Sequence, residues 1–130
     1  GKGGIGKSTI ACNVAAALTE KREKVFQIGC SPKIDSTAFL NNGEMLQSDI
    51  LSKAGTTPSK QNLIACIKEG YKGVRIAESG GPEPATGCAG RGAASALNSL
   101  SLHKVLEELG STVVIYDVLG DVVCGGFAMP

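Results

Sequence analysis

The first eight residues constrain the fold of this chain more than any other stretch. Gly1–Ser8 reads GKGGIGKS and fits the phosphate-binding pattern G-x-x-x-x-G-K-S/T. The glycines let backbone N–H groups surround phosphate oxygens, where a Cβ atom would obstruct the approach. We expect Lys7 to reach the β- and γ-phosphates and the Ser8 hydroxyl to bind Mg²⁺ at a helix N-terminus. The motif predicts a nucleoside triphosphate site, and the helical pattern behind it argues against a glycine turn without a ligand.

The chain is expected to be part of a longer domain. A phosphate-binding loop normally follows a strand, and no strand-like sequence precedes Gly1. The last residues, Gly125–Pro130, have the composition of a loop. We therefore predict that residues 1–130 form a single partial domain, a fragment without its first strand and its C-terminal part.

Charge and cysteine content exclude several classes of protein. The net charge is +1, which gives no indication of a nucleic-acid or membrane surface. No apolar run approaches the length needed to cross a bilayer. The five cysteines, an odd number beside a phosphate-binding loop, favour a reducing cytoplasm over a disulfide framework.

The periodicity of apolar residues predicts alternating helices and strands. Residues 8–21 are expected to form a helix and residues 24–28 a buried strand. A helix and then a strand after a phosphate-binding loop indicate a βαβ unit. The expected fold class is therefore α/β, with a mostly parallel sheet flanked by helices. The same patterns predict further helices at 45–53, 63–68 and 93–109, and further strands at 73–77 and 112–117.

Two carboxylates are candidate magnesium ligands. Asp117 ends a β-branched strand, the position from which P-loop NTPases hold Mg²⁺ on its far side. Residues 118–126 follow it and are rich in glycine, so we expect this segment to change shape when the γ-phosphate leaves. In the loop after the strand at 24–28, Asp35 is a candidate for Mg²⁺ through water and Lys33 for phosphate. The alternative for Asp35 is a helix cap, for which Ser36 and Thr37 also qualify.

The five cysteines fall into two groups. We expect Cys12 and Cys66 to be structural, because Cys12 lies in a predicted helix and Cys66 among apolar neighbours, and we expect Cys30, in the loop after the strand at 24–28, to be structural as well. Cys88 and Cys124 each lie in a glycine-rich loop that follows a strand on the nucleotide-facing edge. Two thiolates are half of a four-cysteine set, and a two-fold dimer axis between the loops would supply the other half. Spacing alone leaves two ordinary loop cysteines as the alternative.

With these motifs, the chain resembles the nitrogenase iron protein (dinitrogenase reductase) family essentially end to end. The most specific matches are Glu78–Gly92, ESGGPEPATGCAGRG, and Tyr116–Pro130, YDVLGDVVCGGFAMP. The resemblance implies a P-loop NTPase fold of the deviant Walker A, SIMIBI type. It implies a cytoplasmic homodimer that passes electrons from one 4Fe–4S cluster, with MgATP hydrolysis, to a molybdenum–iron partner that reduces dinitrogen. It further implies a ferredoxin or flavodoxin as the upstream donor, and neither nucleic acid nor membrane as a partner.

The same resemblance assigns roles to individual residues. Cys88 and Cys124 match the cluster ligands, two from each subunit, and Arg91 matches the arginine that docks on the partner. The first switch is matched by Lys33 and Asp35, and the second by Asp117 and Asp121. Lys2 matches the extra lysine that reaches the nucleotide across the dimer. The implied nucleotide-binding residues are Gly1, Lys2, Gly3, Gly4, Gly6, Lys7, Ser8, Thr9, Lys33 and Asp117. The implied magnesium ligands are Ser8, Asp35 and Asp117. The implied catalytic residues are Lys2, Lys7, Asp35 and Asp121.

The chain departs from the family in places that leave other functions open. Ser31 stands where the family has Asp, one candidate for activating the hydrolytic water, and losing a general base typically costs about 10²–10⁴-fold in rate. Asp121 can take that role, so hydrolysis is expected to be slowed rather than abolished. Residues 10–13 and 27–30 are similar to relatives that reduce tetrapyrroles, as in chlorophyll synthesis. The alternatives are therefore a reductase of that type, a cluster-free partitioning ATPase, or a diverged copy without function.

Overall fold

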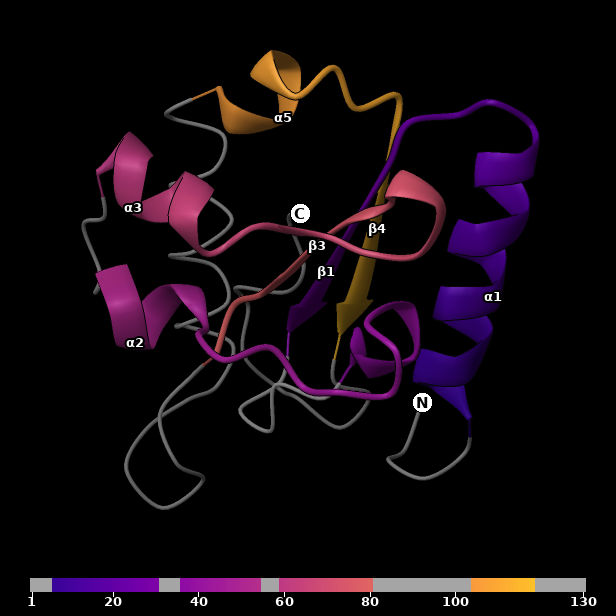
Figure 1. Cartoon of the computed structure of the whole chain (residues 1–130), viewed down its shortest axis with the longest axis horizontal. Coiled ribbons are helices and arrows are strands. Elements are labelled where there is room, and N and C mark those ends of the chain that lie inside the picture. Colours follow the sequence, from indigo (N-terminus) through magenta and orange to yellow (C-terminus); the bar gives the residue numbers. More distant parts are fainter. Residues whose placement is uncertain (1–5, 31–35, 55–58, 81–103, 119–130) are drawn as a thin grey trace.

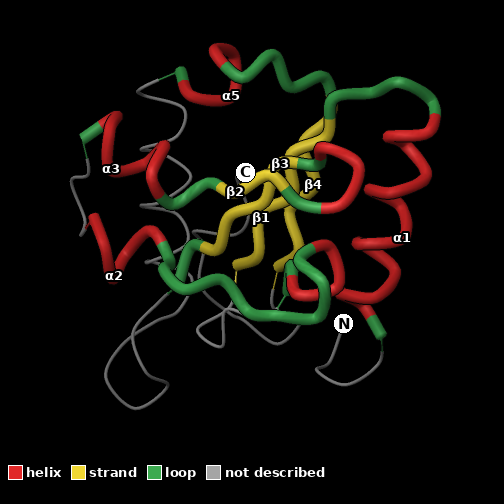
Figure 2. The backbone as a smooth tube through the Cα atoms, in the orientation of Figure 1, coloured by secondary structure: helices red, strands yellow, loops and turns green. Residues whose placement is uncertain are grey.

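A computed structural model describes residues 6–30, 36–54, 59–80 and 104–118 of the chain. These residues form one twisted sheet with helices on both of its faces (Figure 1). The long helix α1 covers one face, and the short helices α2, α3 and α5 lie on the other (Figures 1 and 2). The observed architecture is the α/β class that the sequence predicts.

The helices and strands alternate along the chain. Gly6 precedes the first helix with a left-handed φ of 85°, a conformation that glycine adopts without a steric penalty. The elements are α1 Lys7–Glu20, β1 Val25–Cys30, the 3₁₀ helix η1 Ala38–Leu40, α2 Ile50–Ala54, α3 Lys60–Ala65, β2 Lys68–Glu69, the 3₁₀ helix η2 Tyr71–Gly73, β3 Arg75–Glu78, α5 Val105–Glu108 and β4 Val113–Val118.

In the described part of the chain the sheet has four strands, in the order β2-β3-β1-β4. β1 is central and pairs in parallel with both β3 and β4, whereas β2 runs antiparallel to β3. The prediction of a mostly parallel sheet is therefore confirmed. In this register Gly29 of β1 lies opposite Glu78 of β3 on one side and Asp117 of β4 on the other. These three residues form one row at the carboxyl end of the sheet.

Two apolar clusters hold the layers together. One lies between the sheet and the helices α2, α3 and α5, and contains Phe26, Ile28, Ile50, Leu63, Cys66, Ala77 and Val105. The other lies between the sheet, α1 and η1, and contains Cys12, Ala15, Val25, Leu40, Leu46, Val74 and Ile76. The expected burial of Cys12 and Cys66 is confirmed, since their exposed fractions are 4% and 5%.

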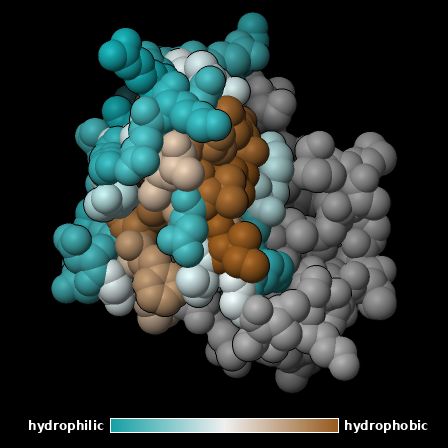
Figure 3. Space-filling view, turned by 90° about the vertical axis from the view of Figure 1, so that its right-hand side faces the viewer, coloured by the Kyte–Doolittle hydropathy of each residue, from teal (hydrophilic) through white to brown (hydrophobic). Residues whose placement is uncertain are grey.

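The outer face of α1 carries apolar side chains that the described residues leave exposed. Ile10 and Val14 lie one turn apart on this helix and are both exposed. Figure 3 views the molecule from this side and shows apolar residues gathered there. No helix in the described ranges is both long enough and apolar enough to cross a membrane.

The predicted boundaries of two helices are wrong. The helix expected at 45–53 begins only at Ile50, because the Asp49 side chain accepts hydrogen bonds from the Ser52 N–H (2.8 Å) and hydroxyl (2.7 Å). The helix expected at 63–68 is instead Lys60–Ala65, and Ser59 caps it by accepting a hydrogen bond from the Asn62 N–H. Both errors come from missing a capping side chain.

Two further differences concern a strand and a helix. β1 continues through Gly29 and Cys30, which were expected in the following loop, because both residues pair with β4. Of the helix expected at 93–109, residues 93–103 lie outside the described ranges. In the described part, the helix is limited to Val105–Glu108, since Lys104 has a left-handed φ of 54° that ends helical geometry on its N-terminal side.

Candidate nucleotide-binding site

The N-terminus of α1 meets the carboxyl end of β4. Ser8, in the first turn of α1, donates a hydrogen bond from Oγ to Asp117 Oδ2 at 2.5 Å. The Lys7 Nζ atom lies 3.7 Å from Asp117 Oδ1. Ser8 and Asp117 are 109 positions apart in the sequence. The fold therefore brings together the two motifs for which the sequence predicted a shared magnesium site.

Asp117 is a buried carboxylate with room for one more partner. Its exposed fraction is 5%, and Oδ2 accepts hydrogen bonds from the hydroxyls of both Ser8 and Ser36. Among the described residues Oδ1 accepts no hydrogen bond, although it faces the Lys7 ammonium. A buried carboxylate oxygen without a donor generally has a water or an ion as its partner. Hard oxygen ligands and retained water are what Mg²⁺ requires, so Ser8 and Asp117 fit this ion.

The start of α1 also suits an anion. The first N–H groups of a helix have no partner within the helix, and the helix dipole places partial positive charge beside them. α1 has 14 residues, its first turn contains Lys7 and no acidic residue, and no side chain caps it at Gly6. The first N–H groups of α1 and the Lys7 ammonium, which faces Asp117 Oδ1 at 3.7 Å, thus make a positively charged helix end that suits phosphate oxygens.

A second buried carboxylate lies two strands away. Glu78, at the end of β3, is fully buried, and its Oε1 accepts hydrogen bonds from both the N–H and the Oγ1 hydroxyl of Thr37, each at 2.8 Å. Gly29 lies between Glu78 and Asp117 in the register. A Cβ atom at Gly29 would come within 1.9 Å of Glu78 Oε2, so only glycine fits here. Sequence reasoning did not single out Glu78, although an acidic residue directly after a buried strand was a usable signal.

Cys12 connects α1 to the backbone of Ser36, beside Asp117. Its thiol donates to the Ser36 carbonyl oxygen at 3.4 Å, and its Sγ accepts from Gln27 Nε2 at 3.4 Å. Burial raises the pKa of the Cys12 thiol above its ordinary value of 9.0, so the thiol keeps its proton near neutral pH. The Ser36 backbone is thereby fixed to α1 while its hydroxyl contacts Asp117. Ser36 and Thr37, which the sequence analysis considered only as helix caps, both belong to this site.

The structure describes part of the predicted site. Gly6, Lys7, Ser8 and Asp117 lie together at the carboxyl end of the sheet, and Thr9 is exposed on α1. Outside the described ranges lie Gly1, Lys2, Gly3, Gly4, Ser31, Lys33, Asp35, Cys88, Arg91, Asp121 and Cys124. Within those ranges no three His, Cys, Asp or Glu side chains gather as a metal site. The roles of all these residues in nucleotide, metal and partner binding remain predictions.

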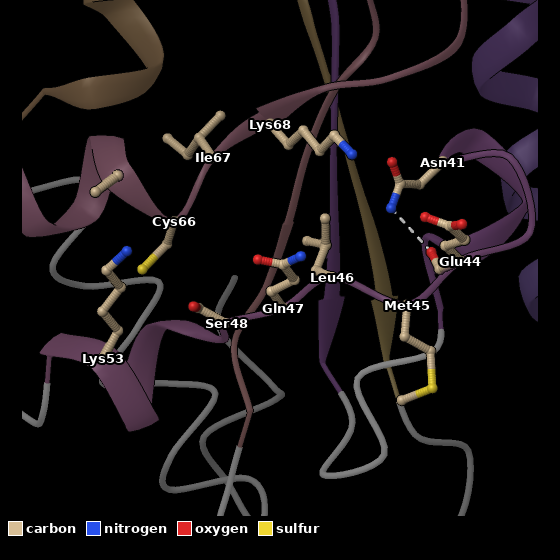
Figure 4. Close-up of a pocket in the computed structure, with 11 residues that line it drawn as sticks. Asn41, Glu44, Met45, Leu46, Gln47, Ser48, Lys53, Cys66, Ile67 and Lys68 are labelled. Atoms are coloured by element: carbon tan, nitrogen blue, oxygen red, sulfur yellow. Dashed lines mark hydrogen bonds between the residues drawn. The ribbon is translucent and has the colours of Figure 1, made fainter.

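A separate pocket of about 350 Å³ lies away from these groups, between residues 41–48 and 65–68 (Figure 4). Its wall includes Lys53 and Lys68, and Asn41 Nδ2 donates to the Glu44 carbonyl oxygen at its rim. Cys66 also lines it, and burial raises the pKa of this thiol. The pocket is lined by mixed polar and apolar side chains that do not converge on one chemical group.

The parallel sheet, the glycine-preceded helix α1 and the Ser8–Asp117 contact together define an α/β P-loop NTPase. A solved structure agrees with this class: cobyrinic acid a,c-diamide synthase from Mycobacterium smegmatis, with bound ADP and magnesium, has a TM-score of 0.58 and 21% sequence identity. The similarity covers 89% of this chain and 46% of that chain, and at this identity it shows the fold alone.

Comparison of sequences identifies the family. The profile of the family described as 4Fe-4S iron sulfur cluster binding proteins, NifH/frxC family, matches residues 1–130. The chain is 51% identical to a nitrogenase iron protein of Methanococcus voltae and 51% identical to nitrogenase iron protein 2 of Paenibacillus durus. These alignments cover 100% of this chain and 46% and 44% of the two relatives, so the chain spans about half of their length. The chain belongs to the NifH/frxC family.

Proposed function

We propose that this chain is the nucleotide-binding part of an ATP-dependent reductase, which passes electrons from a 4Fe–4S cluster to a nitrogenase catalytic partner for dinitrogen reduction. The observation that carries the proposal is the contact between Ser8 and Asp117, which places a hydroxyl and a carboxylate at the phosphate-binding helix of a chain in a cluster-binding family. Residues 1–130 would form one partial P-loop domain of a cytoplasmic homodimer.

In this proposal Lys7 and the first N–H groups of α1 bind and orient the polyphosphate. Ser8 and Asp117, with Asp35, would hold Mg²⁺, which neutralises charge on the phosphate oxygens when bound. Asp117 begins the segment that contains Cys124, so a change of partners at Asp117 would alter the position of a cluster ligand. Lys2, Lys33 and Asp121 would complete the nucleotide site, as the family resemblance implies.

Ser31 is the position at which this chain departs from the family's hydrolytic machinery. Restoring the carboxylate with Ser31→Asp should raise the rate of ATP hydrolysis by at least about 10-fold, because a positioned base contributes about 10²–10⁴-fold and Asp121 would already supply part of it. Phosphate release by the full-length protein measures this rate. An unchanged rate would show that Asp121 alone acts as the base.

The cluster assignment is tested by the cysteines themselves. Cys88→Ser and Cys124→Ser should each abolish the visible absorption of the anaerobically reconstituted full-length dimer, because each subunit would lose one of two ligands. Cys66→Ala is the matched control, since this buried thiol lies in an apolar cluster and its loss should leave the absorption unchanged. Normal absorption in either serine variant would remove the ligand assignment.

The partner is tested by electron donation. The relatives at 51% identity are both nitrogenase iron proteins, which favours a nitrogenase partner over a tetrapyrrole reductase. Reduced protein with MgATP should support dinitrogen reduction by a nitrogenase catalytic component, with ferredoxin or flavodoxin as the electron source and with Arg91 at the docking face. Donation only to a tetrapyrrole-reducing component would select the alternative pathway. ATP hydrolysis without any cluster would instead identify a partitioning-type ATPase.

A further inference from the structure

A buried contact joins the segment that follows Asp35 to the end of β3. The Thr37 N–H and hydroxyl both donate to Glu78 Oε1 at 2.8 Å. The exposed fractions are 1% for Thr37 and 0% for Glu78, so water does not compete for this contact. Hydrogen bonds to a carboxylate are stronger than those between neutral groups, and low local polarity strengthens them further. The two residues therefore form a firm link between segments 41 positions apart.

Glu78 is itself fixed to the centre of the sheet. It lies opposite Gly29 in the parallel register, and its Oε2 occupies the space that a Cβ atom of Gly29 would fill. The next residue, Ser79, donates its N–H to the Gly29 carbonyl oxygen at 2.8 Å. Because its side chain packs against Gly29 and its neighbour is hydrogen-bonded there, Glu78 is held against the backbone of β1. A displacement of Thr37 must either move the end of β3 or break the link.

The two ends of this link lead to different parts of the proposed machinery. Thr37 follows Lys33 and Asp35, the proposed first switch, whereas the chain after Glu78 leads to Cys88. We propose that Glu78 is a positioning residue that couples the first switch to the segment carrying Cys88, an inference that rests on the proposed function. Ser36, adjacent to Thr37, contacts Asp117, which leads to Cys124. Neighbouring residues would thus connect the nucleotide to both cysteines through two separate strand ends.

Two variants weaken the link without a large change of volume. Thr37→Val removes the hydroxyl and keeps the N–H, and Glu78→Gln removes the charge and keeps an acceptor oxygen. The measurement is the rate at which a chelator removes cluster iron from the full-length homodimer, with and without MgATP. The ratio of the two rates should fall about 10-fold in each variant, the factor expected for losing one hydrogen bond to a charged group. Visible absorption should remain that of the intact cluster.

Two controls separate coupling from general destabilisation. Thr37→Ser keeps the hydroxyl and should restore the wild-type ratio. Thr112→Val removes a hydroxyl-to-carboxylate bond of the same kind, from Thr112 Oγ1 to Glu23 Oε2 (2.6 Å), just before β4 at the opposite end of the sheet, and should leave the ratio unchanged.

A wild-type ratio in Thr37→Val with an intact cluster would overturn the proposal, as would an equal fall in Thr112→Val. Should Glu78→Gln fail to fold, Thr37→Val decides alone. A wild-type protein with no cluster, or with no response to MgATP, would refute the proposed function itself and the coupling with it.

Discussion

The two buried carboxylates at the carboxyl end of the sheet share a register but differ in their partners. Asp117 and Glu78 both lie opposite Gly29, on β4 and β3. Among the described residues, the partners of Asp117 are side chains, namely the hydroxyls of Ser8 and Ser36 and the ammonium of Lys7. Glu78 accepts from a backbone N–H as well as a hydroxyl of Thr37.

This difference explains which carboxylate suits which task. Hydroxyl and ammonium partners can rotate away when a metal ion takes their place, so Asp117 can change partners at small cost. A backbone N–H moves only when its segment moves, so the hydrogen bond to Glu78 depends on the position of the chain around Thr37. The same chemical group is thus suited to ligand binding at one strand end and to mechanical coupling at the other.

The largest expected effect is a loss of ATP hydrolysis when Asp117, but not another buried aspartate, is replaced. Asp117→Asn should lower the rate of ATP hydrolysis about 100-fold, because the variant loses the charge proposed to hold Mg²⁺ and its water. Phosphate release from full-length protein measures this. The matched control is Asp49→Asn at the start of α2, a buried aspartate that accepts hydrogen bonds from Ser52 and for which no nucleotide role is proposed, and this variant should leave the rate within about twofold. Equal losses in both variants would contradict a special role for Asp117.

Gly29, which lies opposite both carboxylates, should not tolerate any side chain. Gly29→Ala should lower the free energy of unfolding by about 2 kcal/mol, because the new Cβ overlaps Glu78 Oε2 and the Ser36 side chain. Gly43→Ala should cost only about 1 kcal/mol, since its Cβ meets nothing within 4 Å and only its positive φ of 80° is strained. Denaturant unfolding compares the two. A smaller loss of unfolding free energy for Gly29→Ala than for Gly43→Ala would show that Gly29 is less tightly packed against Glu78 and Ser36 than the structure indicates.

The two hydroxyls on Asp117 should differ in their effect on metal binding. Ser8→Ala should weaken MgATP binding about 10-fold relative to metal-free ATP, because only Ser8 is proposed to bind the ion. Ser36→Ala should shift neither affinity by this factor, since in the described part of the chain its hydroxyl donates to the Asp117 carboxylate and is not proposed to bind the ion. Calorimetric titration with and without Mg²⁺ measures both affinities. An equal metal-dependent loss in the Ser36 variant would place that hydroxyl on the ion.

The smallest effect should be on the stability of the protein at alkaline pH. Burial raises the pKa of the Cys12 thiol above 9.0, the value we take for the unfolded chain. The stability from keeping this thiol protonated is fully present below pH 9.0 and is lost as pH rises through the raised pKa of the folded state. Denaturant unfolding at rising pH should therefore show a steeper decline for the wild-type protein than for Cys12→Ala. Parallel declines would contradict the raised pKa.

Much of the fold follows from local pattern, and the errors have two sources: a capping side chain that was not recognised and a contact between residues distant in the sequence. The ends of the helix predicted at 8–21 and of the strands predicted at 24–28, 73–77 and 112–117 lie within one or two residues of the observed ends, because apolar periodicity reports burial directly. The helix at 45–53 was placed too early, because Asp49 accepts the hydrogen bonds that start α2. Glu78 was missed because its partner, Thr37, is distant in the sequence.

The sequence alone determined the phosphate-binding loop, the α/β class and the pairing of Ser8 with Asp117 as candidate magnesium ligands. The loop depends on residue types at short, fixed spacings, the fold class on apolar periodicity, and the pairing on two recognisable motifs that lie 109 positions apart. Only the tertiary structure decided that Ser36 and Thr37 contact Asp117 and Glu78 on either side of Gly29. Those contacts depend on the register of three parallel strands, and register is set by packing across the whole sheet.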